Sequence, residues 1–461
     1  MFALPPRFLY RAFPLAAGAS AWSTQRLSSS GRLFAVLLVG GLLFGFDTRQ
    51  TLAWLVAVVS FAVLAASLLS NLRWRPALRI RRVLPDVVTA NAAFSYFVEI
   101  SNDGQRTERD LSLRDGLLAP QLDYTSFLRR RGSRPQPGEN RFDRAIGFTR
   151  WLALRDRDRG ATFEVAEVPA IAPGGMVRVE IRTRALRRGY LRFGAVTVLR
   201  PDALGLSRAR YVLPSAGEVL ALPQRHAMPA LRFSAQRHYQ RGGVSLALAV
   251  GDSQEFASLR DYRPGDPRRH IHWRSFARTG RLIVREFRDE YFDRHALIVD
   301  THVDVNDEQR FEAIITVAAS IAGGERPRDA ILDLIFAGSE VIELSAGRGL
   351  GDALQLSRWL AEARIATRGS FADINALLRE RASQLASLVV VLGHRDAARE
   401  TLLDELRARG LPMLSLTVVT DGDVPPLSSL SSPWQRNALH RAFVIRTGHL
   451  VEDLARVAFD P

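Results

Sequence analysis

The chain has 461 residues, of which 47% are hydrophobic and 24% are charged, and its formal net charge is +15. This composition excludes a disordered or fibrous protein and provides enough apolar material for two or three cores. Cysteine is absent, which excludes disulfide bridges, thiolate metal sites and thiol nucleophiles. All 63 basic residues are arginines, which fits either a GC-rich coding bias or a surface attracted to phosphate groups.

Two apolar runs near the start of the chain predict a transmembrane helix hairpin over residues 31–72. The runs cover residues 33–46 and 52–69, and a polar tetrapeptide separates them. The second run is long enough to cross a bilayer, whereas the first is short against the usual requirement of ~20 residues. A cleaved signal peptide is the rival interpretation, but no small-residue cleavage site follows the first run.

The arginines around the hairpin predict its orientation. They are Arg7, Arg11, Arg26 and Arg32 before it, and Arg73, Arg75, Arg79, Arg81 and Arg82 after it. Because positive residues stay on the cytoplasmic side, we expect a multi-pass protein of the inner membrane with a cytoplasmic tail over residues 1–30 and cytoplasmic soluble domains. Gly41 and Gly45 have the spacing that allows two membrane helices to approach closely.

Residues 76–225 predict a β-rich, immunoglobulin-like module. Apolar and polar residues alternate over residues 94–100, 177–181 and 196–198, with the period of half-buried strands. Several short strands between turn signals are typical of a β-sandwich. Residues 120–160 are rich in Arg, Pro and Gly, and we interpret them as an insertion or long loop.

A dense motif lies within residues 240–290, and it resembles the bacterial family catalogued as domain of unknown function 58. The matching positions are Glu255, Phe256, Leu259, Arg260, Tyr262, Pro264, Gly265, Asp266, Arg269, Ile271, Trp273, Ala277, Arg278, Leu282, Val284 and Glu286. Residues 186–194 and 202–206 resemble upstream segments of the family. The resemblance implies a membrane hairpin, a β-rich module, a von Willebrand factor A-like domain at the C-terminal end, and an association with MoxR-type AAA+ ATPases.

The motif itself has two readings. Its signature residues are Arg260, Tyr262, Gly265, Asp266, Arg269, Trp273 and Arg278. Asp266 precedes Arg268 and Arg269 closely enough for a local charge-assisted cluster, and Trp273 offers a face on which a guanidinium can stack. One reading is a structural cluster that fixes a loop; the other makes Arg269, Trp273 and Arg278 a docking surface for an acidic partner.

Three histidines are candidate ligands of a zinc site. His270 and His272 would share a face if they lay on a strand, and His302 lies further along the chain. Nothing in the sequence brings His302 to this pair, and no zinc-protease signature is present. The sequence therefore disfavours a zinc site.

Residues 291–461 predict an α/β domain with a mainly parallel sheet, because short apolar runs alternate with helical stretches. The pattern resembles the von Willebrand factor A domain, whose metal site begins with Asp-x-Ser-x-Ser after the first strand. Here both serine positions are replaced, by His302 and Asp304. Asp300, Asp304 and Asp396 would be the ligands of a degenerate Mg²⁺ site, against the alternative of a metal-free site in which Asp300 accepts backbone N–H groups.

These observations predict a membrane-anchored, non-catalytic adaptor or scaffold, and the family resemblance implies that it works with a MoxR-type AAA+ ATPase in assembly or maturation of protein complexes. No phosphate-binding loop, nucleophile elbow or dinucleotide fingerprint is present, so we expect no enzyme activity and no bound cofactor apart from the degenerate Mg²⁺ site. One alternative is a metal-dependent hydrolase around Asp300. The second is a protein that binds anionic lipid or nucleic acid, of which nucleic acid is disfavoured because only 8% of the residues are aromatic.

Overall fold

The computed structural model describes residues 6–44, 51–118, 124, 147–231, 255–266, 268–288, 294–305, 307–324, 330–337, 341–346, 353–366, 371–420 and 439–458. The chain divides into two compact units, the first made of residues 1–225 and 357–363 and the second of the remainder. Each unit has its own sheets and its own buried core.

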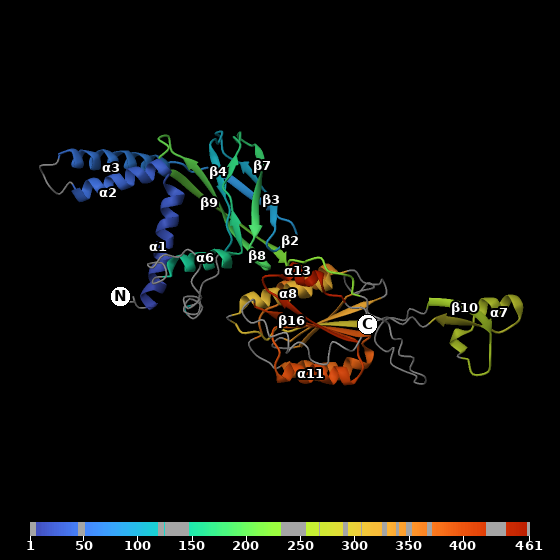
Figure 1. Ribbon diagram of the computed structural model, residues 1–461. Coiled ribbons are helices and arrows are strands. Elements are labelled where there is room, and N and C mark those ends of the chain that lie inside the picture. The colour runs from blue at the N-terminus through green and yellow to red at the C-terminus, as the bar shows by residue number, and fades with distance from the viewer. Residues whose placement is uncertain are drawn as a thin grey trace. The chain divides into compact units, whose positions relative to one another are not determined.

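Three helices begin the first unit: α1 (Pro6–Arg26), α2 (Ser29–Phe44) and α3 (Thr51–Leu72). α2 and α3 lie side by side (Figure 1), and a Cβ atom on Gly41 of α2 would lie 2.8 Å from the backbone oxygen of Ala53 in α3. The two helices can approach this closely because glycine has no side chain at the contact.

Only one of the two predicted membrane-spanning arms is long enough to cross a bilayer among the described helices. Among the described helices, α3 over Leu52–Leu72 is long and apolar enough to cross a membrane, whereas α2 is apolar but shorter. The predicted turn between the arms, and with it Gly45, lies outside the described residues. The tail predicted over residues 1–30 is largely helical, since α1 occupies most of it.

Two packed sheets follow the helices. The first has the order β1-β3-β7-β5, from Leu78–Val83, Ala93–Asn102, Met176–Ala185 and Ala161–Phe163. The second has the order β2-β9-β8-β4-β6, from Val87–Thr89, Arg208–Leu222, Gly189–Pro201, Leu111–Arg114 and Ala166–Val168. The predicted strands at 94–100, 177–181 and 196–198 lie in β3, β7 and β8. The predicted insertion is mostly outside the described residues, and its end forms α6 (Phe148–Arg159).

The two sheets share one core, which contains a buried ion pair. Alternate residues of β3, β7 and β8 are buried in this core, as the period of two requires. Arg82 donates to both carboxylate oxygens of Asp115, at 2.9 and 2.7 Å, and its guanidinium lies over the ring of Phe193. The hydroxyl of Tyr96 donates to the same carboxylate. Arg82, counted in the sequence among the arginines that flank the membrane, therefore belongs to the module's interior.

A turn over residues 202–207 joins the helices to this module. The side chain of Asn71 at the end of α3 donates to the Ser207 hydroxyl at 2.7 Å, and the Ser67 and Ser207 hydroxyls share a hydrogen bond. The start of α2 packs on the same turn, because a Cβ on Gly31 would lie 2.0 Å from the carbonyl oxygen of Leu206. The segment 202–206, which resembles an upstream segment of the family, thus contributes to the turn against which α2 and α3 pack.

The second unit contains a six-stranded sheet of order β14-β13-β12-β15-β16-β17. In that order its strands are Val341–Ala346, Ile331–Ala337, Arg294–Val299, Ser387–Leu392, Met413–Val419 and His440–Arg446. All neighbouring pairs are parallel except β13 and β14, which are antiparallel. The sheet is therefore mixed, and the strand β17 was not predicted from the sequence.

Helices cover both faces of this sheet. Figure 1 shows α8 (Glu308–Ala322) on one face and α11 (Ala397–Ala408) on the other. α10 (Phe371–Arg381) shares a core with α11, in which Ile374 and Leu406 pack with buried residues of the central strands. Two further helices are α9 (Ala353–Glu362), most of which belongs to the first unit, and α13 (Leu450–Ala455). The carboxyl ends of the central strands are left to loops, where ligands gather in sheets of this type.

Candidate functional sites

The signature segment folds as a small β-hairpin with a helix inserted. β10 (Glu255–Asp261) pairs antiparallel with β11 (Ile283–Arg288), and a 3₁₀ turn (Arg268–His270) and α7 (Trp273–Thr279) lie between them. We call these elements the signature module. α7 ends at Gly280, whose φ of 69° closes the helix through a backbone hydrogen bond to Phe276.

An ion pair holds the first turn of the signature module. Arg260 donates to both oxygens of Asp266, at 2.7 and 2.9 Å, and the backbone N–H of Arg263 donates to the same carboxylate at 2.8 Å. These hydrogen bonds lower the pKa of Asp266 to about 2. Gly265 has a φ of 108° in this turn, and the Tyr262 N–H donates to the Leu282 carbonyl. The partner of Asp266 is thus Arg260 and not the predicted Arg268 or Arg269.

The helix α7 of the signature module exposes aromatic and basic side chains. Trp273 is 60% exposed and meets the ring of Phe276 edge to face, at a centroid distance of 6.1 Å. Eight arginines and two aspartates lie between residues 258 and 285. In the described part of the chain, Arg260 alone of these arginines has a carboxylate partner. No described guanidinium lies over Trp273, so the predicted stacking is not observed, while the exposed Arg269, Trp273 and Arg278 remain together on one small module.

The histidines of the signature do not form a metal site. His270 ends the 3₁₀ turn and His272 precedes α7, so they do not lie on the strand that would aim them at one face. The Nδ1 atom of His272 is 2.6 Å from the Ser275 hydroxyl, and Arg269 donates to His270. Within the described residues, no group of three or more His, Asp or Glu side chains is arranged to hold a metal ion.

A second candidate site lies at the carboxyl ends of β12 and β15, where Asp300 follows β12. Its side chain is fully buried. One oxygen accepts the backbone N–H of His302 at 3.0 Å, and the other accepts that of Gly393 at 3.1 Å. Asp300 therefore accepts backbone N–H groups of the loops after the two strands, which is the structural role expected for it.

Arg399 supplies the positive charge at this site. This side chain of α11 is only 4% exposed, and it donates to Asp300 at 2.8 Å from Nε and 3.0 Å from Nη2. The same guanidinium donates to Asp396 at 2.5 Å and to the carbonyl of His302 at 3.0 Å. Burial raises the pKa of Asp396, but the backbone N–H and the guanidinium of Arg399 outweigh it and leave the pKa below its usual value.

The donor set therefore does not fit the Mg²⁺ ion that the predicted fold implies. Mg²⁺ requires several free oxygen ligands, yet Asp300 and Asp396 both point their oxygens at Arg399. The third predicted ligand, Asp304, lies at an exposed end of the loop. The arginine was not identified from the sequence, where it stands 99 residues after its partner.

The structure thus defines a multi-domain α/β protein with several sheets, and one helix among the described residues is apolar and long enough to span a membrane. Residues 258–419 match a family model described as "Protein of unknown function DUF58", in agreement with the resemblance of the signature. "Uncharacterized protein YeaD" of Bacillus subtilis (strain 168) is 29% identical over 138 residues, which cover 29% of this chain and 32% of that protein. The match spans about a third of this relative's length.

Comparison with solved structures adds no argument about fold or function. A PapD-like domain of human CEP192 has 12% identity and a TM-score of 0.16, over 31% of this chain and 85% of that chain. A GH20 exo-β-N-acetylglucosaminidase of Vibrio harveyi has 10% identity and a TM-score of 0.16, over 80% of this chain and 81% of that chain. Both TM-scores are too low to indicate a shared fold.

Proposed function

We propose that this protein is a membrane-anchored, non-catalytic adaptor that docks an acidic partner protein on its signature module. The proposal rests on the exposure of Trp273 on a module that has eight arginines and only two aspartates between residues 258 and 285. Exposed tryptophan and arginine side chains dominate protein–protein binding energies, and an unbalanced positive charge steers an acidic partner to them. The family resemblance makes a MoxR-type AAA+ ATPase the partner, and assembly or maturation of protein complexes the outcome.

Membrane anchoring rests on α3 and on the arginines near it. Over Leu52–Leu72 this helix has the length and apolar composition of a membrane span. α2 packs on it and would form the second arm of a multi-pass anchor in the inner membrane, with the soluble units in the cytoplasm. Arg73, Arg75, Arg79 and Arg81 support this orientation even though Arg82 is buried elsewhere. An enzyme reporter fused after residue 461 should be active in the cytoplasm; periplasmic activity would overturn this topology.

Two rival functions have weaker support. A metal-dependent hydrolase would need Asp300 and Asp396 as ligands, and Arg399 already binds both carboxylates. Binding to nucleic acid or to a lipid surface could also use the arginines and the exposed aromatic pair of the signature module, but nucleic acid is disfavoured because only 8% of the residues are aromatic. An acidic protein surface with an apolar centre matches both features.

The docking proposal is tested with full-length protein in a neutral detergent and a purified MoxR-type ATPase from the same genome. We expect Trp273→Ala and Arg278→Glu each to weaken the complex by about tenfold or more in a pull-down titration. Arg192→Glu is the matched control, because Arg192 is an exposed arginine of the β-module. The proposal would be overturned if the wild type did not bind the ATPase, or if the wild type, the two signature-module variants and the control all bound it equally.

A further inference from the structure

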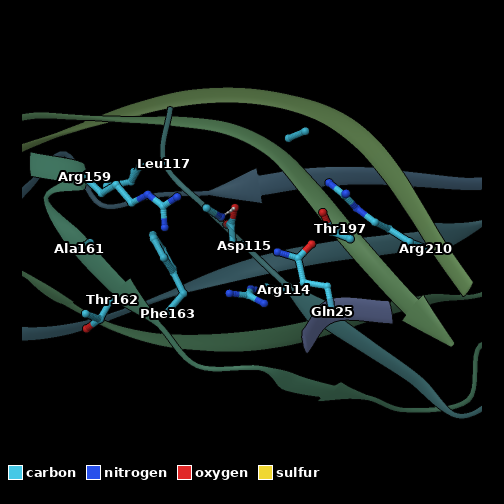
Figure 2. A pocket seen from close by; sticks show the side chains of 12 residues that line it. Gln25, Arg114, Asp115, Leu117, Arg159, Ala161, Thr162, Phe163, Thr197 and Arg210 are labelled. Atoms are coloured by element: carbon cyan, nitrogen blue, oxygen red, sulfur yellow. Dashed lines mark hydrogen bonds between the residues drawn. The ribbon is translucent and has the colours of Figure 1, made fainter. Parts of the chain in front are cut away.

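A pocket of about 340 Å³ lies in the β-module, and three arginines line it. Arg114 comes from the end of β4, Arg159 from the end of α6, and Arg210 from β9. Figure 2 shows that their side chains reach the pocket from different directions, with Asp115 between them. This volume is within the range of sites for small molecules.

Strand register explains why two of these arginines face the same space. Arg114 lies opposite Thr197 of β8, and Arg210 lies opposite Leu199 of the same strand. Thr197 alternates with Val196 and Val198, which are both buried in the sandwich core. Since side chains alternate across a sheet, Arg114, Thr197 and Arg210 stand on the face turned away from that core.

The positive charge of the pocket is not balanced by the carboxylate that lines it. Asp115 accepts hydrogen bonds from Arg82, from the hydroxyl of Tyr96 and from the backbone N–H of Gly116. Its charge is therefore compensated from the core side. Among the described residues, neither Arg114 nor Arg210 lies within ion-pair distance of a carboxylate.

We propose that this pocket binds a phosphoryl group. A guanidinium offers a planar pair of donors that matches phosphate oxygens, and two arginines on one sheet face can hold such a group from two sides. The hydroxyl of Thr197 and the side-chain amide of Gln25 line the same pocket and add neutral donors. This site lies in the first unit, so the inference is independent of docking at the signature module.

The phosphoryl group can come from a lipid headgroup or from a soluble phosphate compound. The hydrogen bonds of Ser67 and Asn71 fix the end of α3 to Ser207, which stands three residues before Arg210 in the sequence. The pocket therefore lies near the base of the apolar helix, where a headgroup would be available if α3 spans the membrane. The test must separate the two sources.

The experiment measures binding of pyrophosphate to the full-length protein in dodecyl maltoside, which contains no phosphate, by isothermal titration calorimetry. We expect saturable binding by the wild type and an affinity at least about tenfold lower for the double variant Arg114→Gln/Arg210→Gln. Arg192→Gln, an exposed arginine of β8 outside the pocket, should bind like the wild type. Absence of binding by the wild type, or the same affinity in the double variant and the control, would overturn the proposal.

A competition arm identifies the source. In mixed micelles that contain phosphatidylglycerol, a headgroup site should show weaker pyrophosphate binding by the wild type, because lipid already occupies the arginines. A site for a soluble compound should give the same pyrophosphate affinity with and without phosphatidylglycerol. The double variant should fold normally because Arg114 and Arg210 are exposed, and an unchanged melting temperature checks this.

Discussion

The guanidinium of Arg399 forms two hydrogen bonds with the buried carboxylate of Asp300, at 2.8 and 3.0 Å. This pair stands at the carboxyl ends of the parallel strands, where the predicted fold would hold a divalent cation. The chain therefore carries its own cation at this position, and the charge of Asp300 is balanced without a metal. A buried carboxylate that loses its only cation is strongly destabilising, which makes this relationship testable.

Arg399→Met should lower the stability of the second unit by about 3–5 kcal/mol, because it leaves the buried Asp300 carboxylate charged and without its cation. Arg379→Met is the matched control. Arg379 pairs with Glu405 at 2.6 Å but is 57% exposed, so its loss should change stability by less than about 1 kcal/mol. Differential scanning calorimetry of the detergent-purified chain compares the two variants. Similar melting temperatures for them would contradict the assigned role of Arg399.

The same pair predicts how the protein responds to metal. Millimolar Mg²⁺ or Mn²⁺ should leave the melting temperature of the wild type unchanged. The Asp300 and Asp396 oxygens accept hydrogen bonds from Arg399, so they are not free to bind a metal ion. Asp300→Asn/Arg399→Met removes both charges and should recover part of the stability lost in Arg399→Met. A large metal-dependent rise in the wild-type melting temperature would restore the metal hypothesis.

Asp266→Asn should loosen the first turn of the signature module, because the amide cannot accept two charge-assisted hydrogen bonds from Arg260. The pKa of Asp266 is depressed to about 2 in the folded chain. Its contribution is therefore present above the unfolded pKa of 3.8 and is lost as the pH falls through about 2. Hydrogen exchange over residues 258–285 should accelerate in the variant at neutral pH, while exchange in the β-module stays unchanged.

Much of the second unit could be predicted from the sequence, because its central strands are continuous apolar runs. The apolar runs over residues 387–392 and 413–419 form β15 and β16, where every residue is buried. β17 was missed because its sequence, His440–Arg446, mixes polar and apolar residues, as an edge strand can. The antiparallel direction of β14 was also missed, since an apolar run does not encode strand direction.

The charged contacts could not be predicted, because the tertiary fold, and not sequence spacing, determines which arginine pairs with each carboxylate. Arg399 and Asp300 stand 99 residues apart in the sequence, which indicated Asp300 only as a metal ligand or as an acceptor of backbone N–H groups. Asp266 likewise pairs with Arg260 on the preceding strand, although Arg268 is nearer to it in the sequence. In both cases the tertiary fold determines which of many chemically identical arginines lies beside the carboxylate. Composition alone cannot identify that arginine.

Gly41→Val should separate α2 from α3, because a Cβ at this position would lie 2.8 Å from the Ala53 carbonyl oxygen and 2.9 Å from the Ala57 Cβ. We expect a loss of about 1–3 kcal/mol, as for other overpacked contacts. Gly40→Val is the control, because it makes the same substitution in the neighbouring residue of α2, where a Cβ would meet nothing within 4 Å. The melting temperature in detergent should fall for Gly41→Val only. An equal fall in both variants would show that helix propensity, and not packing, is responsible.

Tyr96→Phe should change how the β-module responds to alkaline pH. Burial, followed by the charge of Asp115 and the hydrogen bond to it, raises the pKa of Tyr96 far above its ordinary value of 10.0. The folded state therefore keeps this proton when the unfolded state has lost it, so stability is full below pH 10 and declines as the pH rises further. Urea unfolding of the wild type should show this decline between about pH 9 and 11, and Tyr96→Phe should show a smaller one. Tyr211→Phe, on the neighbouring sheet, controls for the loss of a hydroxyl. If Tyr96→Phe and Tyr211→Phe reduced the alkaline slope equally, burial beside the Asp115 carboxylate would not be what holds the Tyr96 proton.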